Sequence, residues 1–296
     1  MKRRTLWQRI IIYGAALLLA GFWFGPFVLV GLGSVIPEAN LFSFPPNWFA
    51  DPPFLGNYRY IFTGEIPQTY LQTGTTRSMV SQEIRWIPYS VFNSFIVALA
   101  VMFIVLVLGS LASYAYARLR FPGRKGTFLF VLLSRLIPTV ALAVPYYAII
   151  QSLGLLNTRW ALIGIYTVLT LPFAVLVLTL YFKSIPKEID DAARVEGATP
   201  LQNLWYITLP LALPSLVGAG LFTFMLAYSE FLLALLITNT ELVRTLPVTV
   251  GAVSTNPDVS WGLLMAGIMI GSIPTMLLVY PVWRFMVRGL TAGAGR

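Results

Sequence analysis

Residues 184–214 read SIPKEIDDAARVEGATPLQNLWYITLPLALP and are the long polar interruption of a very apolar chain. The pattern predicts two short helices joined by a tight turn. Pro186 suits the first position of the first helix, where its missing N–H would have no partner. Gly197 is expected to end that helix, because glycine adopts the left-handed conformation at little cost. Thr199 and Gln202 form a capping box that begins the second helix.

Charge and side-chain size set the expected behaviour of the first of these helices. Asp190 and Asp191 lie in its first turns, where the helix dipole favours acids, and Asp190 is predicted to pair with Arg194 at i,i+4. Ala192 and Ala193 are small, so another surface could come close there. Two interpretations of the segment follow: a solvated connector between membrane spans, or a docking element for a partner protein.

Composition places the chain in a membrane. Of its 296 residues, 57% are hydrophobic and 10% are charged, and the mean hydropathy is +0.78. Soluble domains average about 25% charged residues, so we predict an all-α integral membrane protein. Cysteine and histidine are both absent, which excludes disulfides, thiolate nucleophiles, haem ligation and the usual zinc sites.

Six apolar runs are long enough to cross a bilayer core, which needs roughly 20 apolar residues. The first run follows Arg9 and is too long for the core of a cleaved signal peptide, so we expect an uncleaved first span. A mixed, proline-rich stretch after it reads as a long extramembrane loop. The predicted spans are 10–33, 91–117, 127–150, 161–182, 211–237 and 262–286.

Basic residues decide the orientation of these spans, because cytoplasmic loops are enriched in lysine and arginine. One side would collect Lys2, Arg3, Arg4, Arg9, Arg118, Arg120, Arg124, Lys125, Lys183, Lys187, Arg194, Arg284, Arg288 and Arg296. The other side holds only Arg59, Arg77, Arg85, Arg159 and Arg244 despite longer loops. Both termini and the 184–214 segment are therefore expected in the cytoplasm. The net charge of +9 is a topology signal, and no basic-aromatic pattern indicates nucleic-acid binding.

Two ionisable residues, Arg135 and Glu230, lie well inside apolar runs, where charge is costly and usually functional or paired. For straight helices rising 1.5 Å per residue, they fall at different depths, so direct pairing is not expected. Glu230 is predicted near the outer mouth, facing the bundle interior or water. Pro138 and Pro145 are expected to kink the third span, and Pro274 and Pro281 the sixth.

Motifs for catalysis and nucleotide binding are missing from the sequence. It has neither a Gly-x-Ser-x-Gly elbow nor a histidine base, and its carboxylates are scattered. A Gly-x-x-x-x-Gly-Lys-Ser/Thr phosphate loop is also absent. We therefore expect a non-catalytic chain, and if ATP drives it, another subunit binds the ATP.

The 184–214 segment resembles the cytoplasmic coupling loop of bacterial ABC importer permeases. That pattern is Glu-Ala-Ala, three residues, Gly, nine residues, an aliphatic residue, one residue, then Leu-Pro. Here Asp191 replaces the glutamate, Glu196 stands where an aspartate commonly precedes the glycine, and both changes keep the charge. Further similar stretches are Asn93-Ser94, AYARLRFPG at 115–123, LGLLNT at 153–158, TLPV at 245–248 and GLTAGA at 289–294.

The resemblance covers most of the chain and is close to the second permease subunit of maltose-transporter-like carbohydrate importers. It implies the six-helix type I permease fold: a cytoplasmic N-terminus (1–9), a first span (10–33), an extracytoplasmic loop (34–90), a permease core (91–290) with its coupling loop (184–209), and a cytoplasmic tail (291–296). It also implies coupling residues Glu188, Asp191, Ala192, Ala193, Glu196, Gly197, Ile207, Leu209 and Pro210. The implied pathway residues are Asn93, Tyr228, Ser229 and Glu230, since residues 228–231 are similar to a Trp-Asn-Asp/Glu-Phe stretch in sugar permeases.

The partners implied by this resemblance are a second permease subunit, two ATP-binding cassette subunits that hold ATP and Mg, and an extracytoplasmic solute-binding protein. The chain itself would bind no cofactor, and its location would be the bacterial inner membrane. The implied function is carbohydrate import, of a di- or oligosaccharide, by alternating access. The alternatives are a non-sugar solute such as a polyol or glycerol phosphate, an ion-coupled secondary transporter, or a membrane assembly scaffold.

Overall fold

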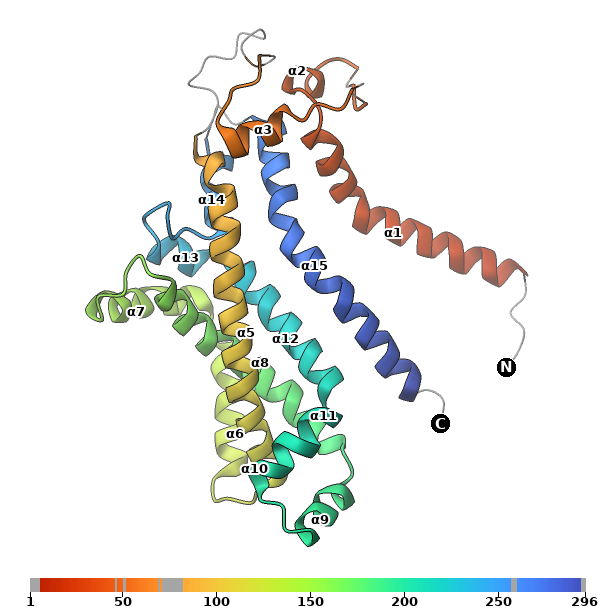
Figure 1. The fold of residues 1–296 in the computed structure, drawn as a ribbon, viewed down its shortest axis with the longest axis vertical. Coiled ribbons are helices and arrows are strands. Elements are labelled where there is room, and N and C mark those ends of the chain that lie inside the picture. Colours follow the sequence, from red (N-terminus) through yellow and green to blue (C-terminus); the bar gives the residue numbers. More distant parts are fainter. Residues whose placement is uncertain are drawn as a thin grey trace. The chain divides into compact units, whose positions relative to one another are not determined.

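The structure is a computed structural model that describes residues 6–45, 47–49, 52–68, 70, 82–256 and 260–293, without the side chains of 281 and 283–293. Arg77, residues 1–5 of the predicted N-terminal segment and 294–296 of the predicted tail lie outside this range. The described residues are helical or irregular, with no strand among them, as Figure 1 shows. The chain divides into two compact units, residues 1–88 with 249–272 and residues 89–248 with 273–296.

The first unit combines the first helix with the loop that follows it. Its helices are α1 (Leu6–Ser34), α2 (Glu38–Leu41), α3 (Gly56–Thr63) and η2 (Glu83–Trp86), together with most of α14 (Leu246–Ser254) and the beginning of α15 (Trp261–Gly293). A buried amide joins two of these elements, since Asn57 Nδ2 donates to the Ser34 carbonyl at 2.9 Å. The Tyr70 hydroxyl donates to Asn57 Oδ1 at 2.6 Å, and burial raises the pKa of this hydroxyl.

A carboxylate from α2 caps the long last helix of the chain. Glu38 accepts hydrogen bonds from the Ser260 hydroxyl at 2.8 Å and from the backbone N–H groups of Trp261 and Gly262 at 3.0 and 2.8 Å. The first N–H groups of any helix lack partners inside the helix and carry the positive end of its dipole. Glu38 therefore supplies the acceptor for the first backbone N–H groups of α15, which have no partner within that helix.

The second unit holds the helices on which the predicted functional residues lie. In chain order they are α5 (Ile87–Arg118), α6 (Arg124–Leu133), η3 (Ser134–Leu136), α7 (Thr139–Ser152), α8 (Arg159–Ser184), α9 (Lys187–Val195), α10 (Pro200–Asn203), η4 (Leu204–Thr208), α11 (Leu209–Leu211), α12 (Leu213–Tyr228) and α13 (Leu232–Ile237). In Figure 1, α7 runs across the direction of α5 and α8.

The helices α5, α8 and α12 pack around small residues and a few polar contacts. A Cβ added at Gly109 of α5 would lie 3.4 Å from the Ala174 side chain of α8. Ser113 of α5 donates to the Val175 carbonyl of α8 at 3.0 Å. Small residues and buried hydroxyls are the usual means of bringing membrane helices together, because lipid tails are as apolar as leucine. Phe182 of α8 is fully buried in a cluster with Tyr114 of α5 and Ala219 of α12.

The number and continuity of the spans agree only in part with the sequence prediction. Four helices are long and apolar enough to cross a membrane, and two bent pairs raise the number to six if each pair is one span. The third span was predicted to kink at Pro138, and the structure has a sharp break there: α6–η3 and α7 meet at 98° on either side of Ile137 and Pro138. The predicted fifth span is also interrupted, with an 82° bend before Leu213 and a break at residues 229–231.

Replacing Glu38 by alanine should destabilise the first unit by about 1–2 kcal/mol, because it removes the acceptor of the α15 N-terminus. Thermal unfolding of the detergent-solubilised protein measures the effect. Glu65→Ala is the matched control, since Glu65 forms an exposed ion pair with Arg59 and such pairs contribute little. Equal melting temperatures for the two variants would contradict the capping role of Glu38.

Candidate functional site

The turn after α9 has the geometry predicted for Gly197. This glycine has φ +85°, the left-handed region in which side chains are strained. Its N–H donates to the Arg194 carbonyl at 3.0 Å, and the next N–H, of Ala198, donates to the Ala193 carbonyl at 2.9 Å. These two bonds form a Schellman motif, which satisfies carbonyls at the end of a helix. The direction in which the chain leaves α9 is therefore fixed by Gly197.

The predicted capping box at the start of α10 is confirmed. The Thr199 N–H donates to Gln202 Oε1 at 2.8 Å, and the Gln202 N–H donates to Thr199 Oγ1 at 3.3 Å. At the start of α9 the prediction was off by one residue, because Pro186 is the cap and the helix begins at Lys187. After α10 the chain continues through η4, a π-helical turn at Leu204–Thr208.

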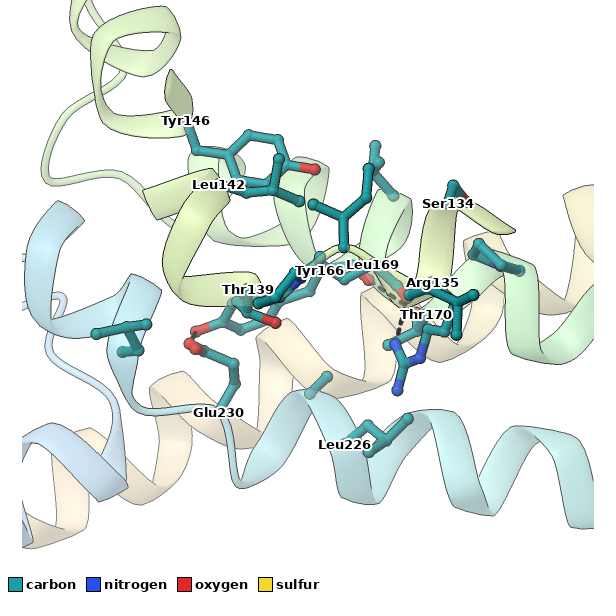
Figure 2. A pocket seen from close by; sticks show the side chains of 17 residues that line it. Ser134, Arg135, Thr139, Leu142, Tyr146, Tyr166, Leu169, Thr170, Leu226 and Glu230 are labelled. Atoms are coloured by element: carbon teal, nitrogen blue, oxygen red, sulfur yellow. Dashed lines mark hydrogen bonds between the residues drawn. The ribbon is translucent and has the colours of Figure 1, made fainter. Parts of the chain in front are cut away.

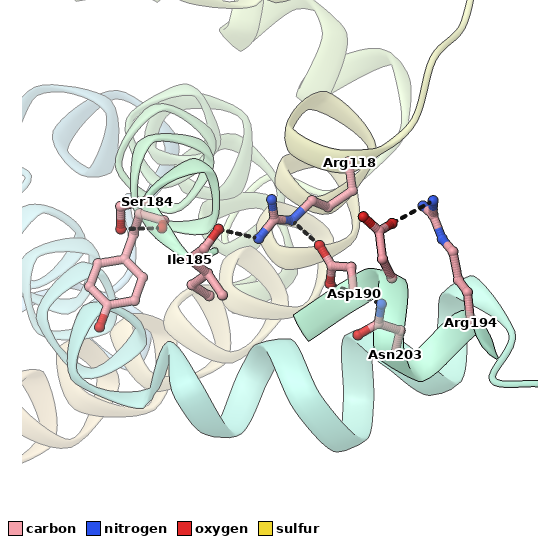
Figure 3. A network of polar contacts seen from close by, with 8 residues as sticks. Arg118, Ser184, Ile185, Asp190, Arg194 and Asn203 are labelled. Carbon is pink, nitrogen blue, oxygen red and sulfur yellow. Dashed lines mark hydrogen bonds and ion pairs between the residues drawn. The ribbon is translucent and has the colours of Figure 1, made fainter. Parts of the chain in front are cut away.

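Asp190 has a different partner from the one predicted. Its carboxylate lies 2.7 Å from Arg118 Nε at the end of α5, and both side chains are almost completely buried, with 5% and 3% exposed. Asn203 Nδ2 donates to the other carboxylate oxygen at 2.9 Å, and Arg118 Nη2 donates to the Ile185 carbonyl at 2.8 Å (Figure 3). The predicted pairing of Asp190 with Arg194 is wrong, since Arg194 pairs with Asp191 at 3.6 Å on the surface.

This buried network (Arg118, Ile185, Asp190 and Asn203) fastens both loop helices to the membrane-spanning part of the second unit. Arg118 belongs to α5, Ile185 follows α8, Asp190 lies on α9 and Asn203 on α10. A buried charge is strongly unfavourable unless it is paired and hydrogen-bonded. Arg118 was missed as a functional residue in the sequence, where it counted only as a basic residue at the end of a span.

The predicted coupling residues divide between surface and interior. Glu188, Asp191, Ala192, Glu196, Gly197 and Pro210 are exposed, Ile207 and Leu209 are half-buried, and Ala193 is 5% exposed. Ala193 therefore packs within this chain, and only Ala192 of the alanine pair is available to a partner. The side chain of Asp191 is 69% exposed, so its carboxylate stays accessible beside Arg194. The roles assigned to these residues remain predictions.

A cavity of about 570 Å³ lies in the second unit, where the broken third span meets α8 and the end of α12. Arg135 of η3, Tyr146 of α7 and Glu230, which follows α12, lie around the same space in Figure 2. The straight-helix argument did not anticipate this cavity, because the 98° bend after Leu136 places α7, with Thr139 and Tyr146, beside Arg135 and Glu230. Arg135 and Glu230 nevertheless form no ion pair with one another, as predicted.

Glu230 is bound by donors from two helices. Its carboxylate accepts a hydrogen bond from the Tyr166 hydroxyl of α8 at 2.7 Å. It also accepts from the backbone N–H groups of Leu233 and Ala234 at 2.9 and 3.2 Å, and so caps α13. The carboxylate thus fixes the break between α12 and α13 and holds it against α8. The prediction that Glu230 lies near the outer mouth is not tested by these contacts.

The other predicted pathway residues do not line this cavity. Asn93 is buried and fastens the loop after α13, donating to the Leu242 and Arg244 carbonyls at 2.9 and 3.0 Å. Tyr228 is buried and stacks on Phe224 with ring centroids 5.4 Å apart, and Ser229 donates to the Met225 carbonyl at 2.8 Å. Their place in a pathway remains a prediction.

Residues 106–288, more than half of the chain, match the family described as binding-protein-dependent transport system inner membrane component. The chain therefore belongs to this family of transport permeases. It is 33% identical to the sulfoquinovosyl glycerol transport system permease protein SmoH of Agrobacterium fabrum, over 94% of this chain and 90% of that protein. It is 31% identical to the trehalose/maltose transport system permease protein MalG of Thermococcus litoralis, over 99% and 98% of the two chains.

A solved structure has the same fold. It is a chain of a bacterial ABC transporter involved in the import of the acidic polysaccharide alginate, with a TM-score of 0.70 at 20% identity. The match covers 96% of this chain and 99% of that chain. The all-helical permease architecture is thus shared over almost the whole length.

Replacing Asp190 by alanine should lower the free energy of unfolding by about 3–5 kcal/mol, because it leaves the buried Arg118 guanidinium without its counter-charge. In the double variant Asp190→Ala with Arg118→Met, much of this loss should be recovered, since no unpaired charge remains. Denaturant or thermal unfolding in detergent measures both. Asp191→Ala is the control, expected to change stability by less than about 0.5 kcal/mol. Additive losses in the double variant would refute the pairing.

Gly197→Ala should cost about 1 kcal/mol or more, because of its left-handed backbone alone. A clash is not the cause, since nothing lies within 4 Å of the added Cβ. We expect normal membrane insertion with uncoupled or lost transport. Gly218→Ala is the control, because that helical glycine also has open space around it and no positive φ. Wild-type transport by Gly197→Ala would show that the angle between α9 and α10 is not critical.

Proposed function

We propose that this chain is the transmembrane permease subunit of an ATP-driven importer that brings a carbohydrate into a bacterial cell. Its family supports a permease that depends on a binding protein. Relatives that match nearly the whole chain are named for sulfoquinovosyl glycerol, for trehalose and maltose, and, in Mycobacterium tuberculosis, for trehalose. A di- or oligosaccharide is the substrate class we assign.

The proposed topology has six spans with both termini in the cytoplasm of a bacterial inner-membrane protein. It counts each bent helix pair as one span, which is compatible with the apolar lengths. The excess of basic residues around residues 118–125 and 183–194 supports the orientation. In this topology the buried network and the α9–α10 turn face the cytoplasm.

The proposed partners are a second related permease subunit, two ATP-binding cassette subunits that hold ATP and Mg, and an extracytoplasmic solute-binding protein. The observation that carries the proposal is the buried attachment of the predicted coupling loop. Its exposed Asp191 and Ala192 are presented on a helix that the buried Asp190–Arg118 pair holds firmly in place. A docking element needs such a combination, with an accessible outer face and a rigid attachment to the spans that must move.

In the proposed mechanism, closure of the ATPase dimer on ATP draws the docked α9–α10 segments together. Arg118 attaches Asp190 of this segment to α5 and binds the Ile185 carbonyl after α8, while Asn203 ties α10 to α9. The displacement therefore passes to the spans as rigid-body motion. The pathway then opens outward, receives the sugar from the binding protein, and returns to the inward-open state after hydrolysis. The work of ATP reaches this chain as movement, and no nucleotide chemistry is required of it.

The remaining alternatives receive less support. An ion-coupled transporter would need an available carboxylate in the spans, whereas Glu230 is already bound by three donors. A scaffold without transport activity would not need the cavity that contains Arg135 and Glu230. A polyol or glycerol phosphate in place of a sugar would leave the mechanism unchanged.

The assembled complex, purified from its native membrane, should hydrolyse ATP faster in the presence of one binding protein and one sugar from a panel. Asp191→Ala should lower this stimulated rate on the order of tenfold, by loss of a charge-assisted contact to the ATPase. Glu241→Ala, which removes an exposed acid from a different loop, is the control. A complex without an associated ATPase, or a response to polyols only, would overturn the proposed function or its substrate class.

A further inference from the structure

Arg135 lies in a membrane-embedded segment, and most N–H donors of its side chain make no hydrogen bond within the described part of the chain. Its Nη1 donates to the Leu169 carbonyl of α8 at 2.6 Å, which is the one hydrogen bond of this side chain in the part of the chain that the structure describes. A guanidinium has five N–H donors, so four are available to other groups. The side chain is exposed within this chain and lines the cavity of about 570 Å³.

An exposed guanidinium cannot face lipid at low cost. An arginine inside a bilayer is costly, and such residues usually face water-filled cavities or polar partners. The acidic residue of the same cavity is not that partner, because the Glu230 carboxylate is taken by Tyr166, Leu233 and Ala234. Arg135 is therefore directed at something that passes through the cavity or that covers it.

The rest of the lining suits a sugar. Among the described lining residues, Arg135 and Glu230 carry the formal charges, so the lining has no net charge and selects neither an anion nor a cation. Tyr146 contributes an aromatic ring, and Thr139 a hydroxyl, to a wall that is otherwise mostly apolar. Cavities of 300–1,000 Å³ with a mostly apolar wall and a few convergent polar groups are typical of small-molecule sites.

We propose that this cavity is a carbohydrate-contact site within this subunit, in which Arg135 donates hydrogen bonds to hydroxyl oxygens of the passing sugar. The inference rests on the proposed function and adds to it that this subunit itself touches the transported ligand. The hydrogen bond to Leu169 holds the guanidinium at the wall of the cavity and uses one of its five donors. Arg135 then binds a ligand in transit, and Glu230 keeps the opposite wall in shape.

The test uses the assembled complex with its binding protein, trapped with vanadate in the presence of the radiolabelled sugar that stimulates ATP hydrolysis. Arg135→Gln should lower the sugar retained by the trapped complex on the order of tenfold, through loss of charged donors. Arg124→Gln should leave retention unchanged. Arg124 is the matched control, because its guanidinium also donates one bond to a backbone carbonyl, that of Leu119.

Arg135→Lys separates binding from assembly. It keeps the positive charge that an acidic residue of the second permease would need, but it lacks the planar fork of donors. Normal assembly with lowered sugar retention supports the proposal. Wild-type sugar retention by both variants overturns the proposal. It is also overturned if the Arg135→Gln complex does not assemble while the Arg135→Lys complex assembles and retains sugar normally. If the wild-type complex itself retains no sugar of the panel, the proposed function fails, which is a distinct outcome.

Discussion

The buried ion pair between Arg118 and Asp190 is the constraint on which the predicted coupling loop depends. Two charges that are almost fully removed from water must remain together, because separating them leaves an uncompensated charge in the interior. The pair joins the last turn of α5 to the first turns of α9, and Asn203 extends the contact to α10. The loop is thereby a rigid extension of the spans, although most of its surface is polar and exposed.

The requirement that buried polar groups have hydrogen-bond partners also explains how two spans can be broken. Irregular backbone at membrane depth is tolerated where it is buried in protein or lines a cavity. The break at residues 134–138 and the break at 229–231 meet at one cavity, and each has its own support. Arg135 donates to α8 across the first break, and Glu230 satisfies backbone N–H groups at the second. The broken spans and the charged residues within them are thus parts of one arrangement.

The sequence was sufficient wherever the deciding contacts are local. The capping box at Thr199 and the left-handed Gly197 follow from neighbours within five residues, and the structure has both. The partner of Asp190 could not be predicted in this way. Arg194 lies four residues away on the same helix, whereas Arg118 is distant in the chain, and only the packing of α5 against α9 favours the latter. The cavity was missed for a related reason, since only the 98° bend after Leu136 places Thr139 and Tyr146 of α7 beside Arg135 and Glu230.

The cavity and the coupling loop are joined by a single helix. α8 contributes Leu169 and Tyr166 to the cavity region and ends just before Ile185, whose carbonyl binds Arg118. Leu169 and Ile185 are sixteen positions apart, which corresponds to about 24 Å of helix. A helix that is buried along much of its length moves as a rigid body. Movement of the loop can therefore change the shape of the cavity through α8 alone, without a series of side-chain rearrangements between them. In the proposed mechanism α8 itself carries the movement, with the Arg118 network at its loop end and the Arg135 and Glu230 contacts at the cavity.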